Sequence, residues 1–189
     1  MFDHGGLQAG QRVLIHAGAG GVGHLAVQFA KARGATVVTT VSTDDVAFAH
    51  SLGADEVIDH TEERFESRLS GIDLVYDLVG GETQERSWAV LKKGGMLVST
   101  VQEPSQEKAG AIGVRATRYT AEPRADQLRE IDALIQSGKV RPFVARTFAY
   151  GDAKEALRGL EEGHGSGKQV LDLAGVVAKL PDPIYKAGD

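Results

Sequence analysis

The sequence predicts an α/β protein in which a Rossmann-type, doubly wound parallel sheet of about six strands carries helices on both faces. Two observations favour this fold class. Short apolar runs alternate with helical patterns along most of the chain, as they do when helices wrap a parallel sheet. In addition, the first apolar run leads directly into a glycine-rich stretch and a helical pattern, which is typical of a strand–turn–helix unit.

The expected sheet is built from apolar runs that have the length of buried strands. The last of these runs alternates apolar and polar residues, which is typical of an edge strand. The strands are expected at 12–17, 35–41, 55–60, 72–79, 95–101 and 112–120.

The helices between these strands are predicted from apolar residues that recur every three or four positions. Gly34 ends the first helix. The apolar stripe of this helix should face the sheet, and it consists of Val22, Leu25, Ala26, Phe29 and Ala30. We expect helices at 22–34, 44–53 and 82–93, and a loop at 102–111.

The pattern changes after Pro123, and the chain divides into three expected parts. A helix at 125–139 should direct Leu128, Ile131 and Ile135 inward. A strand at 142–150, a helix from Asp152, a loop at 162–168 and a strand at 169–173 follow. The parts are a dinucleotide-binding Rossmann domain at 1–143, a C-terminal strand–helix–strand segment at 144–175 and a tail at 176–189.

The composition of the chain indicates which kinds of partner and which cellular location to expect. The 189 residues are 42% hydrophobic and 25% charged, which is enough apolar material for a core. The net charge of −5 gives no electrostatic reason to expect binding to nucleic acid or to an anionic membrane. No run reaches the roughly 18 apolar residues of a membrane span, and cysteine is absent, which excludes thiolate metal sites. We expect a cytoplasmic protein that needs no metal.

The glycine-rich stretch carries the functional prediction. Gly18, Gly20 and Gly23 fit G-x-G-x-x-G between a predicted strand and a predicted helix, which is the context that a dinucleotide-binding loop requires. Such glycines allow a tight turn, close approach of a pyrophosphate and close packing of helix on strand. The N–H groups at the start of the helix then face the anion.

The end of the second strand bears on the choice of dinucleotide. A site for NADH usually places an acid there to bind the ribose 2′-hydroxyl, whereas this chain has Val41, Ser42 and Thr43. This difference favours NADPH, with NADH as the alternative. We also expect Ser42 or Thr43 to cap the next helix, whose first turn holds Asp44 and Asp45, and this role does not exclude contact with the 2′-phosphate.

The order of motifs resembles one known family. The stretches VLIHAGAGGVGHLAVQFAKARGATVV, LGADEVIDH, DLVYDLVGGET, LKKGGMLVS and GKQVLDL are similar to those of the zinc-free medium-chain dehydrogenase/reductases, specifically the quinone oxidoreductase-like group. The resemblance runs from about residue 7 to residue 174. It implies an NADPH-dependent oxidoreductase that transfers hydride to a small-molecule substrate, either a quinone or an α,β-unsaturated carbonyl compound.

The resemblance also implies the residues that bind the cofactor, although it assigns no catalytic side chain. The pyrophosphate would lie on the glycine loop, the 2′-phosphate at the second strand, and the riboses and nicotinamide at the fourth and fifth. These residues are Gly18, Ala19, Gly20, Gly21, Val22 and Gly23; Ser42, Thr43 and His60; Leu78, Val79 and Gly80; and Ser99, Thr100 and Val101.

Members of this group have a GroES-like substrate domain of ~120 residues ahead of the cofactor domain, and this chain starts almost at the first cofactor-domain strand. We therefore expect either a truncated chain or a naturally short homologue. Phe148, Tyr150, Val170 and Leu171 should then present an apolar surface to a separate substrate domain or to a second copy. A dinucleotide-binding or scaffolding domain without catalysis is the alternative function.

A second alternative is a short-chain dehydrogenase. Tyr150 and Lys154 fit Y-x-x-x-K, and Ser137 lies 13 residues upstream. That chemistry needs the tyrosine and the lysine on one helical face. Asp152 and Glu155 instead predict a helix start after Tyr150. The buried stripe of this helix should leave Lys154 in solvent, and it consists of Ala153, Ala156, Leu157 and Leu160.

Other polar side chains are assigned simpler roles. His16 is expected to be a packed structural residue, and His24, off the apolar stripe, is expected to be partly solvated. Asp77 is placed to touch a cofactor or to hold a turn. The spacing of His4, His50 and His164 gives no metal site.

Overall fold

The structure is a computed structural model that describes residues 1–161 and 165–174. Its main feature is a six-stranded parallel sheet with the order β3-β2-β1-β4-β5-β6. The chain moves outward from β1 in one direction and then crosses to β4 on the other side, which is the doubly wound topology. This confirms the predicted fold class. The strands are β1 (Arg12–Ile15), β2 (Thr36–Val41), β3 (Glu56–Asp59), β4 (Ile72–Asp77), β5 (Leu91–Ser99) and β6 (Arg115–Arg118).

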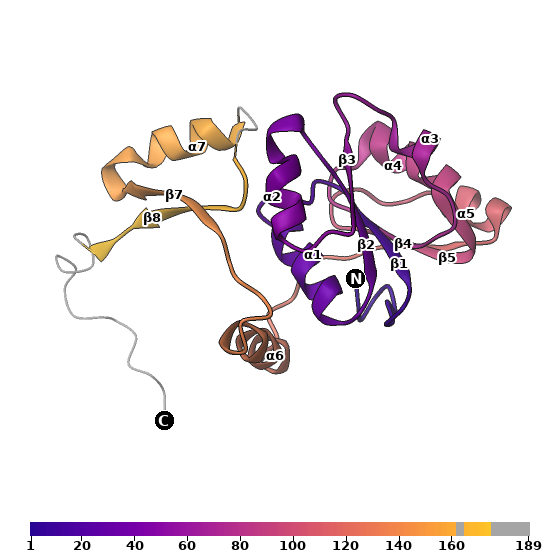
Figure 1. Ribbon diagram of the computed structural model, residues 1–189, viewed down its shortest axis with the longest axis horizontal. Helices are drawn as coiled ribbons and strands as arrows, with labels where there is room; N and C mark the ends of the chain where they lie inside the picture. The colour runs from indigo at the N-terminus through magenta and orange to yellow at the C-terminus, as the bar shows by residue number, and fades with distance from the viewer. Residues whose placement is uncertain (162–164, 175–189) are drawn as a thin grey trace.

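Helices connect the strands and cover the sheet on both faces (Figure 1). Short 3₁₀ turns stand at three of the helix or strand boundaries. The α-helices are α1 (Gly23–Ala32), α2 (Val46–Ser51), α3 (Phe65–Arg68), α4 (Gly81–Ser87), α5 (Gln106–Ile112), α6 (Ala125–Gln136) and α7 (Ala153–Glu161). The 3₁₀ turns are η1 (Thr43–Asp45), η2 (Trp88–Val90) and η3 (Tyr150–Asp152).

The core has two layers, one on each face of the sheet. Alternation along β1 places Val13 and Ile15 in the layer under α1, whereas Leu14 lies in the opposite layer with Phe65 and Trp88. Because both faces are covered, the strands carry continuous apolar runs rather than an alternating pattern. The edge strands differ: β3 has a single fully buried residue, Ile58, and β6 has both of its ends exposed.

The buried face of α1 differs from the predicted stripe. Val22 is 52% exposed, while His24 is fully buried. Leu25 and Phe29 are half-buried, and the buried residues of the helix include Val27 and Gln28. The expectation of a partly solvated His24 is therefore wrong. The reason is that α1 packs on the sheet with one side and against the segment before β7 with another, as described below.

The predicted loop at 102–111 contains the helix α5. Ser105 caps the helix by accepting a hydrogen bond from the backbone N–H of Lys108 at 3.2 Å. At the other end, Gly113 adopts a left-handed conformation (φ +70°), which terminates the helix. The helix predicted at 82–93 is shorter than expected, because α4 ends at Ser87 and β5 already begins at Leu91.

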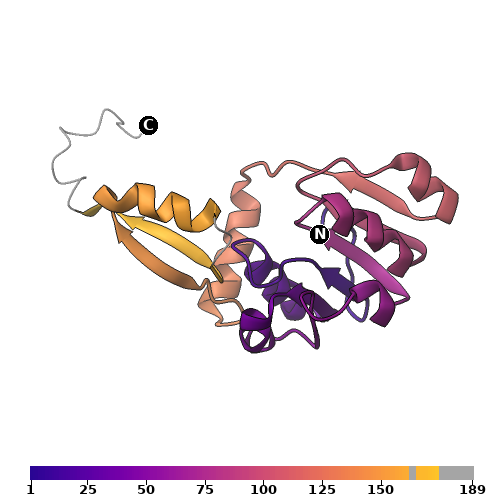
Figure 2. The ribbon, with the colours of Figure 1, turned by 90° about the horizontal axis from the view of Figure 1, so that it is seen from above.

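A smaller, two-stranded sheet follows α6. Strands β7 (Val144–Ala149) and β8 (Lys168–Asp172) are parallel and are connected through α7, with Phe148 opposite Leu171. Figures 1 and 2 show this unit, together with α6, beside the main sheet rather than within its layers. The domain division proposed from the sequence stays a prediction, and the tail at 176–189 lies outside the described residues.

This position explains a second set of differences from the sequence analysis. Leu128 and Ile135 of α6 are 60% and 36% exposed, so the expected inward direction is wrong for them. Leu157 and Leu160 of α7 are also about three-fifths exposed, at 61% and 60%, whereas Ala156 is buried. The amphipathic pattern predicted the helices correctly, but it does not tell which apolar faces are covered.

Candidate functional site

The predicted site residues meet at one edge of the main sheet. They follow β1, β2, β3, β4 and β5, and the carboxyl ends of parallel strands lie at the same edge. The connections from β1 and from β4 lead to opposite sides at this point, and a doubly wound sheet binds its ligands at such a switch point. The arrangement therefore brings the three predicted groups of residues together.

The turn between β1 and α1 is shaped by missing side chains. A Cβ atom on Gly18 would lie 1.9 Å from Thr39 Oγ1, and a Cβ atom on Gly23 would lie 2.0 Å from the carbonyl oxygen of Ala17. The left-handed residue of the turn is Ala17 (φ +53°), not one of the glycines, so the expected role of a glycine in the tight turn is corrected. Glycine is needed at 18 and 23 for close packing.

Of the remaining glycines of the turn, Gly20 leaves room for a ligand, whereas Gly21 lies against Gly167 and Lys168. A Cβ atom on Gly20 would meet only the carbonyl oxygen of Ala17, at 3.3 Å. Helix α1 starts after Val22, and no side chain caps its first N–H groups. Open backbone N–H groups at a helix start bind anions, so this turn has the geometry of a phosphate site.

His16, at the end of β1, is held by two hydroxyl groups. Ser87 Oγ donates a hydrogen bond to the carbonyl oxygen of Thr83 (2.7 Å), so it accepts the one from His16 Nε2 (2.9 Å). His16 Nδ1 is then the acceptor for Thr40 Oγ1 at 3.0 Å. Burial lowers the pKa of His16 to about 4, despite the opposing effect of the Asp77 charge. His16 is a neutral packing residue, as expected.

The tip of β2 carries hydroxyl groups and acids. Ser42 Oγ donates to Asp45 Oδ2 (2.9 Å), and the hydroxyl groups of Thr43 and Thr61 lie 2.8 Å apart. Ser42 precedes η1 and Thr43 lies within it, and in the part of the chain that the structure describes no side chain makes a capping hydrogen bond to η1 or to α2. The capping interpretation is therefore wrong for both residues. Hydrogen bonds from Thr43 and Thr61 lower the pKa of Asp59, which lies before the exposed His60.

The loops after β4 and β5 form the other side of the edge. Val79 and Val101 are 51% and 49% exposed at the tips of these loops, and Leu78 and Thr100 are half-buried. Ser99 is fully buried and directs its hydroxyl group to Asp77. The two valines therefore offer an apolar surface at this side of the site.

A contact that the sequence did not predict joins the C-terminal unit to the glycine loop. The backbone N–H of Gly167 donates to the carbonyl oxygen of Ala19 (2.7 Å), and the backbone N–H of Lys168 donates to the carbonyl oxygen of Phe143 (2.8 Å). Lys168 Nζ lies 3.5 Å from the position that a Cβ atom on Gly21 would take. The sequence placed this segment in a loop, and no local pattern indicates its partner.

His24 is the centre of this contact. Its Nε2 accepts a hydrogen bond from the backbone N–H of Phe143 (3.3 Å), so its Nδ1 carries the proton and donates to the carbonyl oxygen of Gly20 (2.9 Å). Burial lowers the pKa of His24, which favours this neutral form. Gln28, one turn later, exchanges hydrogen bonds with the backbone of Arg141. His24 and Gln28 can therefore be buried, because the polar atoms of each side chain form hydrogen bonds with the backbone.

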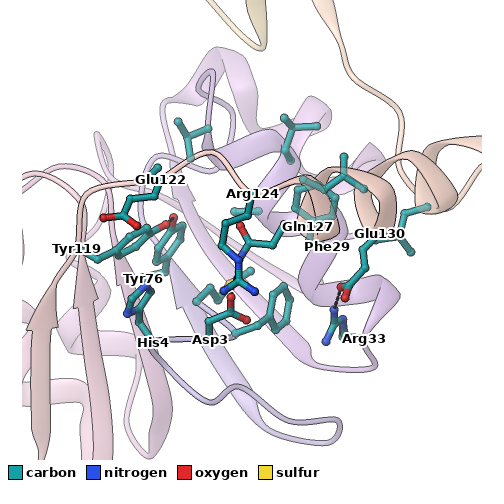
Figure 3. Close-up of a pocket in the computed structure, with 18 of the residues that line it drawn as sticks. Asp3, His4, Phe29, Arg33, Tyr76, Tyr119, Glu122, Arg124, Gln127 and Glu130 are labelled. Carbon is teal, nitrogen blue, oxygen red and sulfur yellow. Dashed lines mark hydrogen bonds and ion pairs between the residues drawn. The ribbon is translucent and has the colours of Figure 1, made fainter. Parts of the chain in front are cut away.

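A cavity of about 560 Å³ opens beside the glycine loop, between the N-terminal segment, α1 and α6 (Figure 3). The half-buried Leu25 and Phe29 line it on the α1 side. At its other side the hydroxyl groups of Tyr76 and Tyr119 lie 2.8 Å apart, and the ring of His4 stacks on that of Tyr119. This cavity explains why the predicted stripe of α1 is only partly covered.

The residues of the short-chain alternative are spread over three elements. Ser137 follows α6, Tyr150 belongs to η3 and is 54% exposed, and Lys154 lies in α7. The tyrosine and the lysine do not share one α-helix, so the arrangement that this chemistry needs is not formed.

The described residues contain no group of three or more histidine, aspartate or glutamate residues that could hold a metal ion. His164, one of the histidines considered, lies outside these residues. In the same part of the chain, no helix combines the length and the apolar character that crossing a membrane requires.

Comparison with known proteins places the chain in a family. Residues 52–171 match the family described as zinc-binding dehydrogenase. The chain is 31% identical to the mitochondrial NAD(P)H oxidoreductase RTN4IP1 of Danio rerio, over 92% of this chain and 53% of the relative. It is 35% identical to the chloroplastic NADPH-dependent alkenal/one oxidoreductase of Arabidopsis thaliana, over 86% of this chain and 41% of the relative.

Among solved structures, the chain is similar to the Escherichia coli quinone oxidoreductase complexed with NADPH. The TM-score is 0.78 and the identity 30%, over 87% of this chain and 58% of that chain. The chain therefore belongs to the zinc-binding dehydrogenase family, within the quinone oxidoreductase-like group of the medium-chain dehydrogenase/reductases, as the motifs predicted. It spans about half the length of the curated relatives that it matches.

Proposed function

We propose that this chain is the cofactor-binding part of an NADPH-dependent oxidoreductase that reduces quinones or α,β-unsaturated carbonyl compounds. The observation that carries the proposal is the turn at residues 17–23, where packing excludes side chains at Gly18 and Gly23 and leaves the start of α1 uncapped. The nicotinamide of the cofactor supplies the hydride. The protein supplies the position and the electrostatic environment.

The residues at the sheet edge fit a dinucleotide. The six residues from Gly18 to Gly23 hold the pyrophosphate against the N–H groups of α1. Leu78, Val79 and Gly80 lie along the riboses. The β5 loop, from Ser99 to Val101, faces the nicotinamide with Thr100 and Val101, while the buried Ser99 holds the loop from within. Relatives whose names specify NADPH or NAD(P)H, and the NADPH complex of a similar structure, support this assignment.

Selectivity for NADPH rests on the tip of β2. Ser42, Thr43 and His60 offer polar groups to the 2′-phosphate, and no acid follows Val41 directly. The nearby Asp45 carboxylate accepts one hydrogen bond at each oxygen, from Ser42 and from Ser166, which hold it in place beside the tip of β2. NADH binds more weakly in this proposal.

The test is a pair of measurements on the chain. Quenching of the Trp88 fluorescence or the change in NADPH fluorescence gives the dissociation constant of NADPH, and steady-state NADPH oxidation with a quinone gives turnover. Binding with turnover supports the full proposal. Tight binding without turnover supports the alternative, a dinucleotide-binding domain that is not catalytic alone, and no binding at all contradicts both.

The remaining expectations belong to the same proposal. Of the four residues expected on an apolar surface, Phe148 is buried, so that expectation is wrong for it because the residue packs inside the β7–β8 unit. Tyr150, Val170 and Leu171 are 54%, 38% and 40% exposed, and they suit a substrate domain or a second copy. Independence from zinc is tested by metal analysis of the active protein. Location in the cytoplasm is tested by imaging a tagged chain, because named relatives come from mitochondria and chloroplasts.

A further inference from the structure

A fully buried carboxylate stands at the carboxyl end of β4. Asp77 Oδ1 accepts hydrogen bonds from the backbone N–H groups of Val79 (3.0 Å) and Gly80 (2.8 Å). Its Oδ2 accepts from Gln84 Nε2 (2.9 Å) and from Ser99 Oγ (2.8 Å). Within the described residues Asp77 forms no salt bridge, so these four donors alone compensate its burial.

Ser99 continues the network into the loop after β5. While its hydroxyl group donates to Asp77, its oxygen accepts from the backbone N–H groups of Val101 (3.2 Å) and Gln102 (3.1 Å). The oxygen therefore uses its one hydrogen and both lone pairs. The turn after β5 is fixed by the same pair of side chains that fixes the turn after β4.

The two loops also touch each other directly. Gln102 Oε1 accepts from the backbone N–H of Gly81 (2.7 Å), and the backbone oxygen of Gln102 accepts from Gln84 Nε2 (3.2 Å). Gly80 has φ +76°, and a Cβ atom there would lie 3.1 Å from Val101 Cγ2. Any change in the separation of the loops would break several of these bonds together.

The outer surface of this network is apolar. Val79 and Val101, half exposed, lie on the solvent side of a buried polar centre, next to the switch point of the sheet. We propose that Asp77 is a positioning residue, which holds the loops after β4 and β5 at a fixed separation so that they form one surface for the nicotinamide half of the dinucleotide. This inference rests on the proposed cofactor function.

The network requires a group that only accepts hydrogen bonds. All four partners of Asp77 are donors, and an ionised carboxylate has four acceptor positions and no hydrogen. Asparagine has the same shape, but its amide group would direct hydrogen atoms at two of those donors. The substitution Asp77→Asn therefore disrupts the loops with little change in volume.

The experiment compares two ligands on the full chain. NADPH spans both halves of the site, whereas 2′,5′-ADP contains only the adenosine half. In Asp77→Asn we expect the dissociation constant of NADPH to rise about tenfold, which corresponds to the loss of one or two hydrogen bonds, and that of 2′,5′-ADP to change less than about twofold. Hydrogen exchange at the amides of Val79, Gly80, Val101 and Gln102 should accelerate.

The matched control is Asp73→Asn, at the other end of the same strand. Asp73 accepts from the backbone N–H of Arg12 (2.9 Å) and pairs with Lys92, so its loss destabilises the fold without touching the loops. We expect this control to leave the ratio of the two dissociation constants unchanged. An equal loss of both ligands in Asp77→Asn, or unchanged NADPH binding, overturns the inference.

A second variant covers the case in which Asp77→Asn does not fold. Ser99→Ala keeps the charge at Asp77 but removes one of its donors and both anchors of the β5 loop. We expect the same selective loss of NADPH affinity. If the dissociation constants of NADPH and 2′,5′-ADP both stay at their wild-type values, or both change by the same factor, the inference is overturned. Failure of the proposed function is a different result, because the wild-type chain would then bind neither ligand.

Discussion

The Nε2 atom of His24 and the backbone nitrogen of Phe143 are 3.3 Å apart, although 119 positions separate them in the chain. Through this bond, the helix that begins at the glycine loop holds the segment that leads into β7. We predict that His24→Leu, which leaves the Phe143 N–H without a partner, lowers the free energy of unfolding by about 1–3 kcal/mol. Urea denaturation measures this change.

The control for this substitution is His50→Leu, at an exposed position of α2. It should change the free energy of unfolding by less than about 0.5 kcal/mol. If the two variants are equally stable, the bond to Phe143 contributes nothing measurable.

His16 predicts a dependence of stability on pH. Because its pKa is lowered from 6.5 to about 4 in the folded chain, the unfolded chain binds the extra proton between these values. The contribution of the neutral His16 ring to the free energy of unfolding is therefore complete above pH 6.5. It decreases by about 1.4 kcal/mol per pH unit as the pH falls towards 4, and it is lost below pH 4. Urea denaturation at several pH values measures the slope.

The pKa of His24 is also lowered in the folded chain. The contribution of His16 is therefore isolated by comparing the wild type with His16→Gln. The variant should show a smaller slope between pH 4 and 6.5 than the wild type. Nuclear magnetic resonance of the His16 ring provides an independent check, since protonation of that ring near pH 6.5 would contradict the buried neutral state.

In the glycine loop, Gly18 and Gly23 are needed for packing, whereas Gly20 leaves space for a ligand. Gly20→Val should weaken NADPH binding at least about tenfold without unfolding the chain, since the new side chain projects into the space next to the start of α1. Gly110→Ala, in α5, is the control, because a Cβ atom there meets nothing within 4 Å. Unchanged NADPH affinity in Gly20→Val would show that the phosphate lies elsewhere.

The acid near the tip of β2 should affect the choice of cofactor. Asp45→Asn removes one negative charge near the predicted 2′-phosphate, and a charge near a protein surface, screened by solvent, contributes on the order of 1 kcal/mol. We expect NADPH to bind about fivefold more tightly in the variant and NADH to change much less. Equal changes for the two cofactors would contradict the placement of the 2′-phosphate at Ser42 and Thr43.

The main sheet and the site edge could be predicted from the sequence because their signals are local. Buried strands appear as apolar runs, and the turn at 17–23 joins a strand to a helix within a few residues. The helix α5 was missed because its cap, Ser105, stands in a polar stretch that also suits a loop. The burial of His24 depends on a contact with Phe143, and nothing in the local pattern of either residue indicates it.

The exposed leucines of α7 also show that a local sequence pattern does not determine which residues of a helix are buried. Periodicity predicted that Ala156, Leu157 and Leu160 form one buried stripe, but only Ala156 is covered. The pattern describes one helix, whereas burial depends on what lies opposite. The Asp77 network is a similar case, because the sequence marked Asp77 as either a cofactor ligand or a turn residue, and the structure gives it the turn.

The hydrogen bond from Gly167 to the carbonyl oxygen of Ala19 has a consequence for the electrostatics of the loop. A free carbonyl oxygen beside a bound pyrophosphate would present the negative end of its dipole to an anion. The hydrogen bond from the backbone N–H of Gly167 offsets part of that dipole, and Lys168 adds a positive charge next to Gly21. The segment that begins β8 therefore helps to set the potential at a turn formed almost 150 residues earlier.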